Sequence, residues 1–209
     1  MNGMLRDSKT AFGRALTEPG VVERADLRGR FGFMAFHGGE LERRTDIIAT
    51  TAAEASGASS YVVTHPPPNP RHFPSTDVRR GQSELLDEFL DHVSVVVTVH
   101  GYGRDGMFTS LLLGGRNRDL ADTLGRRLAA ALPDYQVVTD LPAIPRELRG
   151  LHPSNPVNAP PGGGVQLELP PRVRGLGPRW ADWDGEGLVP PAAAVVDVLA
   201  QVASAWETA

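Results

Sequence analysis

Two histidines in this sequence each follow an apolar run and come directly before a glycine. His37 follows the run from Phe31 to Phe36, and His100 follows the run from Val93 to Val99. Short apolar runs of this kind predict buried strands, and ligands of open α/β sheets bind beyond the carboxyl ends of the strands. A single histidine is more often a structural residue. Two in the same setting favour a shared site.

Two glutamates follow the first of these histidines within five residues of the sequence. Gly38 and Gly39 allow positive φ and close backbone approach, so the chain can fold back and bring Glu40 or Glu42 near the imidazole of His37. The spacing alone does not choose between the two glutamates. Because the chain has no cysteine, any metal ion must be held by histidine and carboxylate.

A histidine, a carboxylate and a second histidine can hold one zinc ion and leave a coordination position open for water. Zinc lowers the pKa of bound water from 15.7 to about 7. Glu168 lies on a third predicted strand, where it could take the water's proton and pass it to a leaving amine. These residue types therefore predict metal-assisted hydrolysis.

The elements around the first histidine form a strand, a helix and a strand. Thr45 to Ser56 is helix-like, with Thr45 as the expected N-cap and Gly57 as the stop signal. Residues 59–64 read as the second strand, which predicts a parallel crossover. Residues 164–169 alternate with period two, so Gln166 and Glu168 share one face of a later strand.

The remaining periodic segments predict a single α/β domain over residues 1–209. It would have three layers, α/β/α, around a twisted mixed sheet, with residues 1–28 as a peripheral segment and residues 175–209 as a loop plus a C-terminal helix packed on the core. The other predicted elements are a possible edge strand at 21–23, helices within 81–92, 117–131 and 192–206, and strands at 93–99, 110–113 and 135–138.

Composition excludes several classes of function. The net charge of −4 argues against nucleic acid as the main partner. The first 20 residues carry charge where a signal peptide needs an apolar core, and no run approaches the roughly 18 apolar residues of a membrane span. We therefore expect a cytoplasmic monomer without a membrane partner, released by lysis if it acts outside the cell.

Five ordered motifs resemble the poly-γ-glutamate hydrolase family of zinc-dependent, carboxypeptidase-like enzymes. The resemblance runs from about Val21 to Arg174. The stretch HGGELERRT is similar to the family signature H-G-G-x-[IL]-E-x-x-T. The other four are His72 to Thr76 for the H-x-x-S-T loop, Val97 to Gly101 for the second ligand strand, Leu113 to Asn117 for the Gly-Gly turn, and Gln166 to Pro170 for the catalytic strand.

The resemblance implies His37, Glu42 and His100 as ligands of one zinc ion and Glu168 as general base. Glu40 also fits the H-x-x-E spacing of classical carboxypeptidases, but the Leu41-Glu42 match favours Glu42 and leaves Glu40 facing solvent or supporting the site. The implied substrate is poly-γ-glutamate or a short γ-glutamyl peptide. After Thr76 the family usually has Arg-Phe-Asp and this chain has Asp-Val-Arg, which leaves the exact substrate open.

Several further residues are candidates for substrate binding. A γ-glutamyl chain carries one free carboxylate per residue, which an arginine fork binds well. The candidates are His72, Arg116, Asn117, Arg118, Arg172 and Arg174. We expect the four arginines to converge where strand ends meet, although each could instead be a surface residue of an Arg-rich chain.

Two other functions remain possible on the sequence. A related zinc amidohydrolase or carboxypeptidase acting on another acidic amide would keep the metal site and ignore poly-γ-glutamate. A binding protein would hold γ-glutamyl polymers without cleaving them, and its mark would be a missing base. Glu168 is present.

Overall fold

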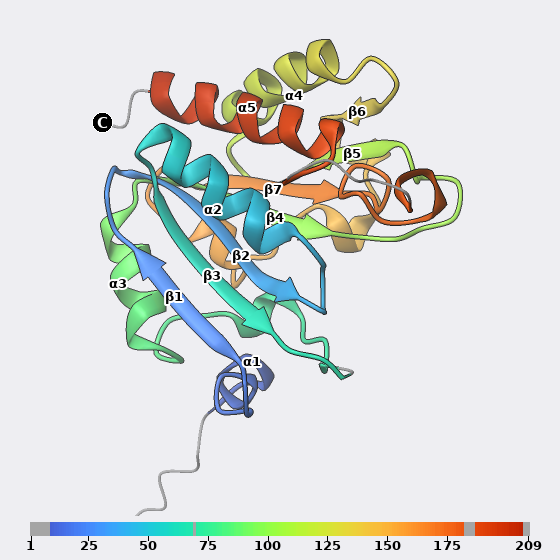
Figure 1. Cartoon of the computed structure of the whole chain (residues 1–209). Coiled ribbons are helices and arrows are strands. Elements are labelled where there is room, and N and C mark those ends of the chain that lie inside the picture. The colour runs from blue at the N-terminus through green and yellow to red at the C-terminus, as the bar shows by residue number, and fades with distance from the viewer. Residues whose placement is uncertain (1–8, 69, 182–186, 207–209) are drawn as a thin grey trace, which may run out of the picture.

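The computed structural model describes residues 9–68, 70–181 and 187–206, and these form one seven-stranded sheet with helices on both faces (Figure 1). The strand order is β1-β3-β2-β4-β7-β5-β6. The strands are β1 (Val22–Asp26), β2 (Phe31–Gly39), β3 (Ser59–His65), β4 (Val95–Gly101), β5 (Ser110–Leu113), β6 (Gln136–Val138) and β7 (Gly164–Leu169). The α-helices are α1 (Ala11–Ala15), α2 (Thr45–Ser56), α3 (Glu84–His92), α4 (Arg118–Ala131) and α5 (Pro190–Ala205).

The four central strands, β3, β2, β4 and β7, run parallel to one another. β1 pairs antiparallel with β3 at one edge, and β5 pairs antiparallel with β7 on the other side, with β6 parallel to β5. The predicted mixed sheet is therefore confirmed. Because β2, β4 and β7 are adjacent and parallel, their carboxyl ends meet at one edge of the sheet.

Apolar side chains cover both faces of the sheet and make the predicted three layers. On one face α2, α4 and α5 pack against alternate residues of the strands, such as Phe33, Val97 and Leu167. On the other face α1 and α3 supply Phe12, Leu86 and Phe89 to a second cluster. The side chains that carry chemistry must therefore lie where the strands leave these two cores.

Several elements differ from the sequence prediction. Thr45 is not the N-cap of α2: the cap position is Arg44, at φ 73°, and the Thr45 hydroxyl donates to the Glu42 carbonyl at 2.8 Å. The short helix α1 lies in a segment for which no helix was expected. α5 begins at Pro190, because proline is favoured in the first turn, and β4 begins at Val95. In the described part of the chain, no helix is long and apolar enough to cross a membrane.

Candidate metal centre

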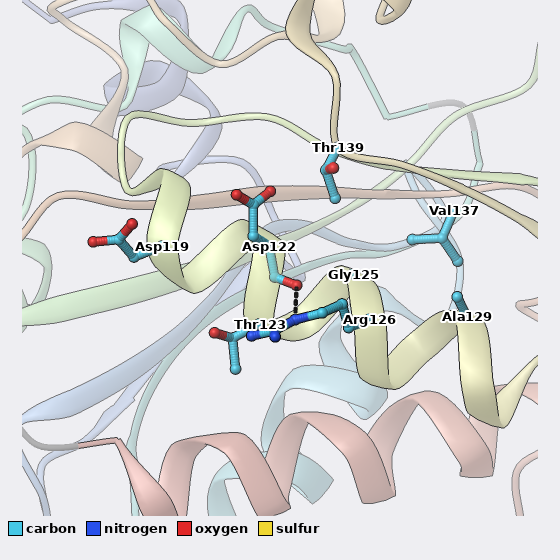
Figure 2. Close-up of a pocket in the computed structure, with 8 residues that line it drawn as sticks. All are labelled: Asp119, Asp122, Thr123, Gly125, Arg126, Ala129, Val137 and Thr139. Carbon is cyan, nitrogen blue, oxygen red and sulfur yellow. Dashed lines mark hydrogen bonds between the residues drawn. The ribbon is translucent and has the colours of Figure 1, made fainter.

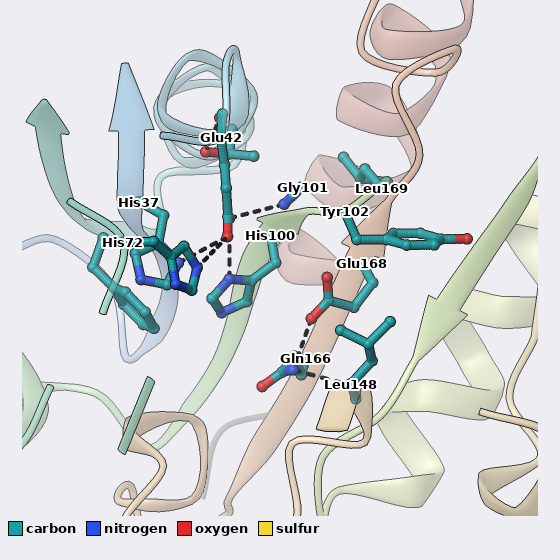
Figure 3. A network of polar contacts seen from close by, with 12 residues as sticks. His37, Glu42, His72, His100, Gly101, Tyr102, Leu148, Gln166, Glu168 and Leu169 are labelled. Carbon is teal, nitrogen blue, oxygen red and sulfur yellow. Dashed lines mark hydrogen bonds and ion pairs between the residues drawn. The ribbon is translucent and has the colours of Figure 1, made fainter. Parts of the chain in front are cut away.

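Three side chains of the predicted site meet at the carboxyl ends of β2 and β4 (Figure 3). One ligand atom each from His37, Glu42 and His100 lies within 4.8 Å of the other two, and all three residues are buried. The Glu42 oxygens lie 2.8 Å from His37 Nδ1 and 3.1 Å from His100 Nδ1. The same carboxylate accepts a hydrogen bond from the backbone N–H of Gly101 at 2.9 Å.

The local backbone explains how His37 and Glu42 meet. The β2–β3 register shifts between Ala35 and Gly38, so one extra residue in β2 interrupts the alternation that would otherwise place His37 on the face of Ala35. Such bulges commonly re-aim a side chain beside a site. Gly39, at φ 68°, then turns the chain back, and the Glu42 N–H donates to the His37 carbonyl at 2.7 Å.

The hydrogen bonds of His37 indicate that a cation fits between these ligands. Its Nε2 lies 3.0 Å from the Phe73 carbonyl, which can only accept, so Nε2 carries the proton. Burial lowers the pKa of His37 despite the opposing charge of Glu42, which favours the neutral ring. In that tautomer Nδ1 is an acceptor that faces a carboxylate oxygen, and a metal ion between them would relieve the repulsion. A backbone acceptor on the outer nitrogen is also the usual support of a metal-bound histidine.

Glu42 and His100 support the same interpretation. Burial would raise the pKa of Glu42, but the adjacent imidazoles, above all His100, hold it well below its usual range, so the group is an anion. Burial also disfavours the charged form of His100, yet Glu42 outweighs it and raises the pKa of His100. The pKa values of the two histidines thus shift in opposite directions, because Glu168 also raises that of His100 whereas His100 and His72 lower that of His37. Among the described residues, His100 Nε2 has no hydrogen-bond partner.

Glu168 lies directly across the ladder from His100, on the neighbouring strand β7. Its side chain is buried, and its Oε1 accepts a hydrogen bond from Gln166 Nε2 at 2.8 Å (Figure 3). Burial raises the pKa of Glu168 to about 7, against the lowering effects of His100, Gln166 and Arg174. A carboxylate with a pKa near 7 suits proton transfer at neutral pH.

His72 and Arg174 are the two predicted substrate-binding residues that lie at this centre. The His72 ring is 4.5 Å from the His37 ring between centroids, and its Nε2 is 3.7 Å from Glu42 Oε1. Arg174 is buried, and its guanidinium donates to the carbonyls of Leu169, Arg43 and Tyr102. The Leu169 carbonyl ends β7, and the Arg43 and Tyr102 carbonyls follow β2 and β4, so Arg174 connects the three segments that carry the site.

The expected convergence is wrong for Arg116 and Arg118, and Asn117 lies with them. Because β5 runs antiparallel to β7, the turn after β5 leads to the opposite edge of the sheet, where the Asn117 N–H donates to the carbonyl of Gly164, the first residue of β7. Asn117 caps α4, and the Arg118 side chain donates to three backbone carbonyls. Arg116 is exposed beside them. Arg172 follows β7, so it lies at the edge of Glu168, close enough to Tyr135 for its charge to oppose the rise in the pKa of that hydroxyl.

Glu40 and the remaining histidines lie outside the group of ligands. Glu40 forms an ion pair with Arg43 at the surface. His65 is buried against the Phe36 carbonyl, at 3.0 Å. A hollow of about 710 Å³ against α4 and β6 holds no histidine, so volume alone does not locate the chemistry (Figure 2).

Comparison with known proteins identifies the fold and the family of this chain. No curated protein sequence matches the chain. In fold it is similar to the structure of a bacteriophage poly-gamma-glutamate hydrolase, with a TM-score of 0.72, 21% identity and 92% of each chain covered. It is also similar to YNDL in its zinc-free form, with a TM-score of 0.65, 18% identity, and 87% of this chain and 88% of that chain covered. The model of one sequence family, poly-gamma-glutamate hydrolase, matches residues 14–176, so the chain belongs to that family.

Proposed function

We propose that this protein is a zinc-dependent hydrolase that cleaves the γ-glutamyl amide bonds of poly-γ-glutamate or short γ-glutamyl peptides. The observation that carries the proposal is the buried His37–Glu42–His100 group with Glu168 on the adjacent strand, in a chain of the poly-gamma-glutamate hydrolase family. His37 and His100 would bind one zinc ion through Nδ1, and Glu42 through its carboxylate.

Glu168 and Arg174 have different roles in the proposed hydrolysis. A bound zinc ion would supply a Lewis acid for the substrate carbonyl and lower the pKa of water at the site. Glu168 accepts the proton of the attacking water and returns it to the departing nitrogen, so one carboxylate serves as base and then as acid. Its burial keeps bulk water from competing for that proton. Arg174 holds the segments after β2, β4 and β7 in place and contributes positive charge beside Glu42 and Glu168.

The proposal is tested by measuring zinc content and polymer shortening on the same preparation. We expect about one zinc per chain by elemental analysis and a progressive loss of long poly-γ-glutamate on a gel. Chelation should stop the shortening, and added zinc should restore it. An α-linked polyglutamate of equal length is the control substrate. Zinc without cleavage of any γ-glutamyl substrate in a panel would assign another amidohydrolase activity, and polymer binding without cleavage would leave a binding protein.

Glu40 and Glu42 are a matched pair for testing the ligand assignment. We expect Glu42→Gln to weaken zinc affinity by at least about 10–100-fold, the loss typical even of residues that only support a ligand. Glu40→Gln should leave zinc affinity within about twofold, because its ion pair with Arg43 is at the surface and such pairs contribute about 0–1 kcal/mol. Equilibrium dialysis against a zinc buffer measures both. The reverse order would restore the H-x-x-E spacing.

A further inference from the structure

A cavity of about 580 Å³ opens beside the proposed base. The 3₁₀ turn η1 (Ser75–Asp77) lines one side of it, and the loop that contains the 3₁₀ turn η3 (Arg146–Leu148) lines the other. Gln166 also lines it, and the Gln166 side chain contacts both Glu168 Oε1 and the Leu148 carbonyl (Figure 3). The volume falls within the range of ligand pockets, and the position places any occupant next to Glu168.

A chain of buried amides makes the base of this cavity rigid. Asn155 Nδ2 donates to Gln166 Oε1 at 2.8 Å, and the Val157 N–H donates to Asn155 Oδ1 at 3.1 Å. These bonds fix which end of each amide is the donor, so Gln166 must present its N–H groups to Glu168 and to Leu148. The cavity and the proposed base therefore share one ordered hydrogen-bond network.

The charged groups of the cavity are predominantly positive. Arg149 is held by its Nε and Nη2, which donate to the carbonyls of Ile144 and Pro142 at 2.8 and 3.2 Å. Arg146 is exposed, and within the described residues its guanidinium has no hydrogen bond or ion pair. The one acid of the cavity, Glu147, is already paired with Arg104. Ser75 and Thr76 supply hydroxyl groups on the facing wall.

We propose that this cavity binds the free carboxylate of the glutamyl residue that carries the leaving nitrogen, with Arg146 as its ion-pair partner. The inference rests on the proposed function. Because Glu168 returns a proton to that nitrogen, the residue bearing it must lie on the Glu168 side, which is where the cavity opens. Arginine is suited to this role because its planar fork matches a carboxylate.

The geometry of the linkage gives this site a role in specificity. In a γ-linked chain the carbon that bears the amide nitrogen also bears the free carboxylate. In an α-linked chain the free carboxylate lies two methylene groups farther along the side chain. A cation on the wall of this cavity therefore favours γ-linked over α-linked glutamyl polymers.

The test combines a variant with a modified substrate. Arg146→Ala should raise KM for a γ-linked oligoglutamate about tenfold or more, the scale of a charge-assisted hydrogen bond, and change kcat less than about twofold. Arg146→Lys should recover part of the loss. Arg127→Ala, which removes an exposed arginine of α4, is the control and should behave as the wild type. Equal KM values for the Arg146→Ala and Arg127→Ala variants would overturn the proposal.

The modified substrate carries an amide in place of the free carboxylate on the leaving side. It should raise KM for the wild type as much as Arg146→Ala does, and raise it little further in that variant. An undiminished effect in the variant would place the carboxylate elsewhere. If the wild type cleaves neither substrate, the proposed function fails, and calorimetry with the γ-linked oligomer then tests the site. Tenfold weaker binding to Arg146→Ala would support it, and equal binding would overturn it.

Discussion

Replacing Glu168 with Gln is expected to lower kcat by about 10²–10⁴-fold, the loss typical of a general acid–base group, while zinc content and fold are kept. The amide has nearly the same shape, and its oxygen can still accept the hydrogen bond from Gln166 Nε2. It cannot take a proton from water. Single-turnover kinetics on a γ-linked oligoglutamate, with zinc measured on the same samples, checks the result. The matched control is Glu88→Gln, an exposed acid of α3 away from the site, which should change kcat less than about twofold.

The pH profile provides an independent reading of the same group. Glu168 must be ionised to accept a proton, so kcat/KM should rise with pH and level off above the pKa of this carboxyl. Burial raises that pKa to about 7, and a cation at the adjacent ligands would lower it, so the acidic limb is expected at or below pH 7. The residual activity of Glu168→Gln should lack this limb. Near-normal turnover with an unchanged limb would mean that the base is another residue.

The placement of Glu168 and His100 was predictable because strand alternation is a local property. Val165 and Leu167 point to one face of β7 and pack in the core, so Gln166 and Glu168 share the other face. In the same way His100 lies in β4 an even number of residues after Val96, so the two side chains share one face. Because β4 and β7 are parallel neighbours, the alternation of each strand is enough to bring His100 and Glu168 together.

His37 reaches the site because of a backbone feature that cannot be read from the sequence. Its parity matches Phe33 and Ala35, which pack in the core on the α2 face. Only the register shift between Ala35 and Gly38 frees it from that alternation. A bulge depends on how two strands pair, and the sequence of β2 alone does not indicate it.

The positions of Arg116 and Arg118 were predicted wrongly because they depend on the direction of β5. Ser110–Leu113 contains three consecutive leucines, which predict a strand but do not indicate its direction. A parallel strand would have brought Arg116 and Arg118 to the edge of Glu168, whereas the antiparallel one carries them away. The position of Arg146 could not be predicted either, because its loop packs beside Gln166 only through tertiary contacts.

Removing either histidine ligand is expected to abolish stoichiometric zinc binding, and with it activity. His37→Ala and His100→Ala each leave two of three protein ligands and open a buried space beside the Glu42 anion. His65→Ala is the matched control: it also removes a buried histidine at a strand end, but one bonded to the Phe36 carbonyl and outside the ligand group. Its zinc content should stay near that of the wild type even if its stability falls.

Thermal unfolding with and without zinc distinguishes lost binding from lost folding. A ligand at 100 times its dissociation constant stabilises the native state by about 2.7 kcal/mol, so zinc should raise the melting temperature of the wild type and of His65→Ala. It should leave His37→Ala and His100→Ala unchanged, provided that both show a cooperative transition. Full zinc content in both ligand variants would contradict the metal centre, because a zinc ion held elsewhere would not depend on these two imidazoles.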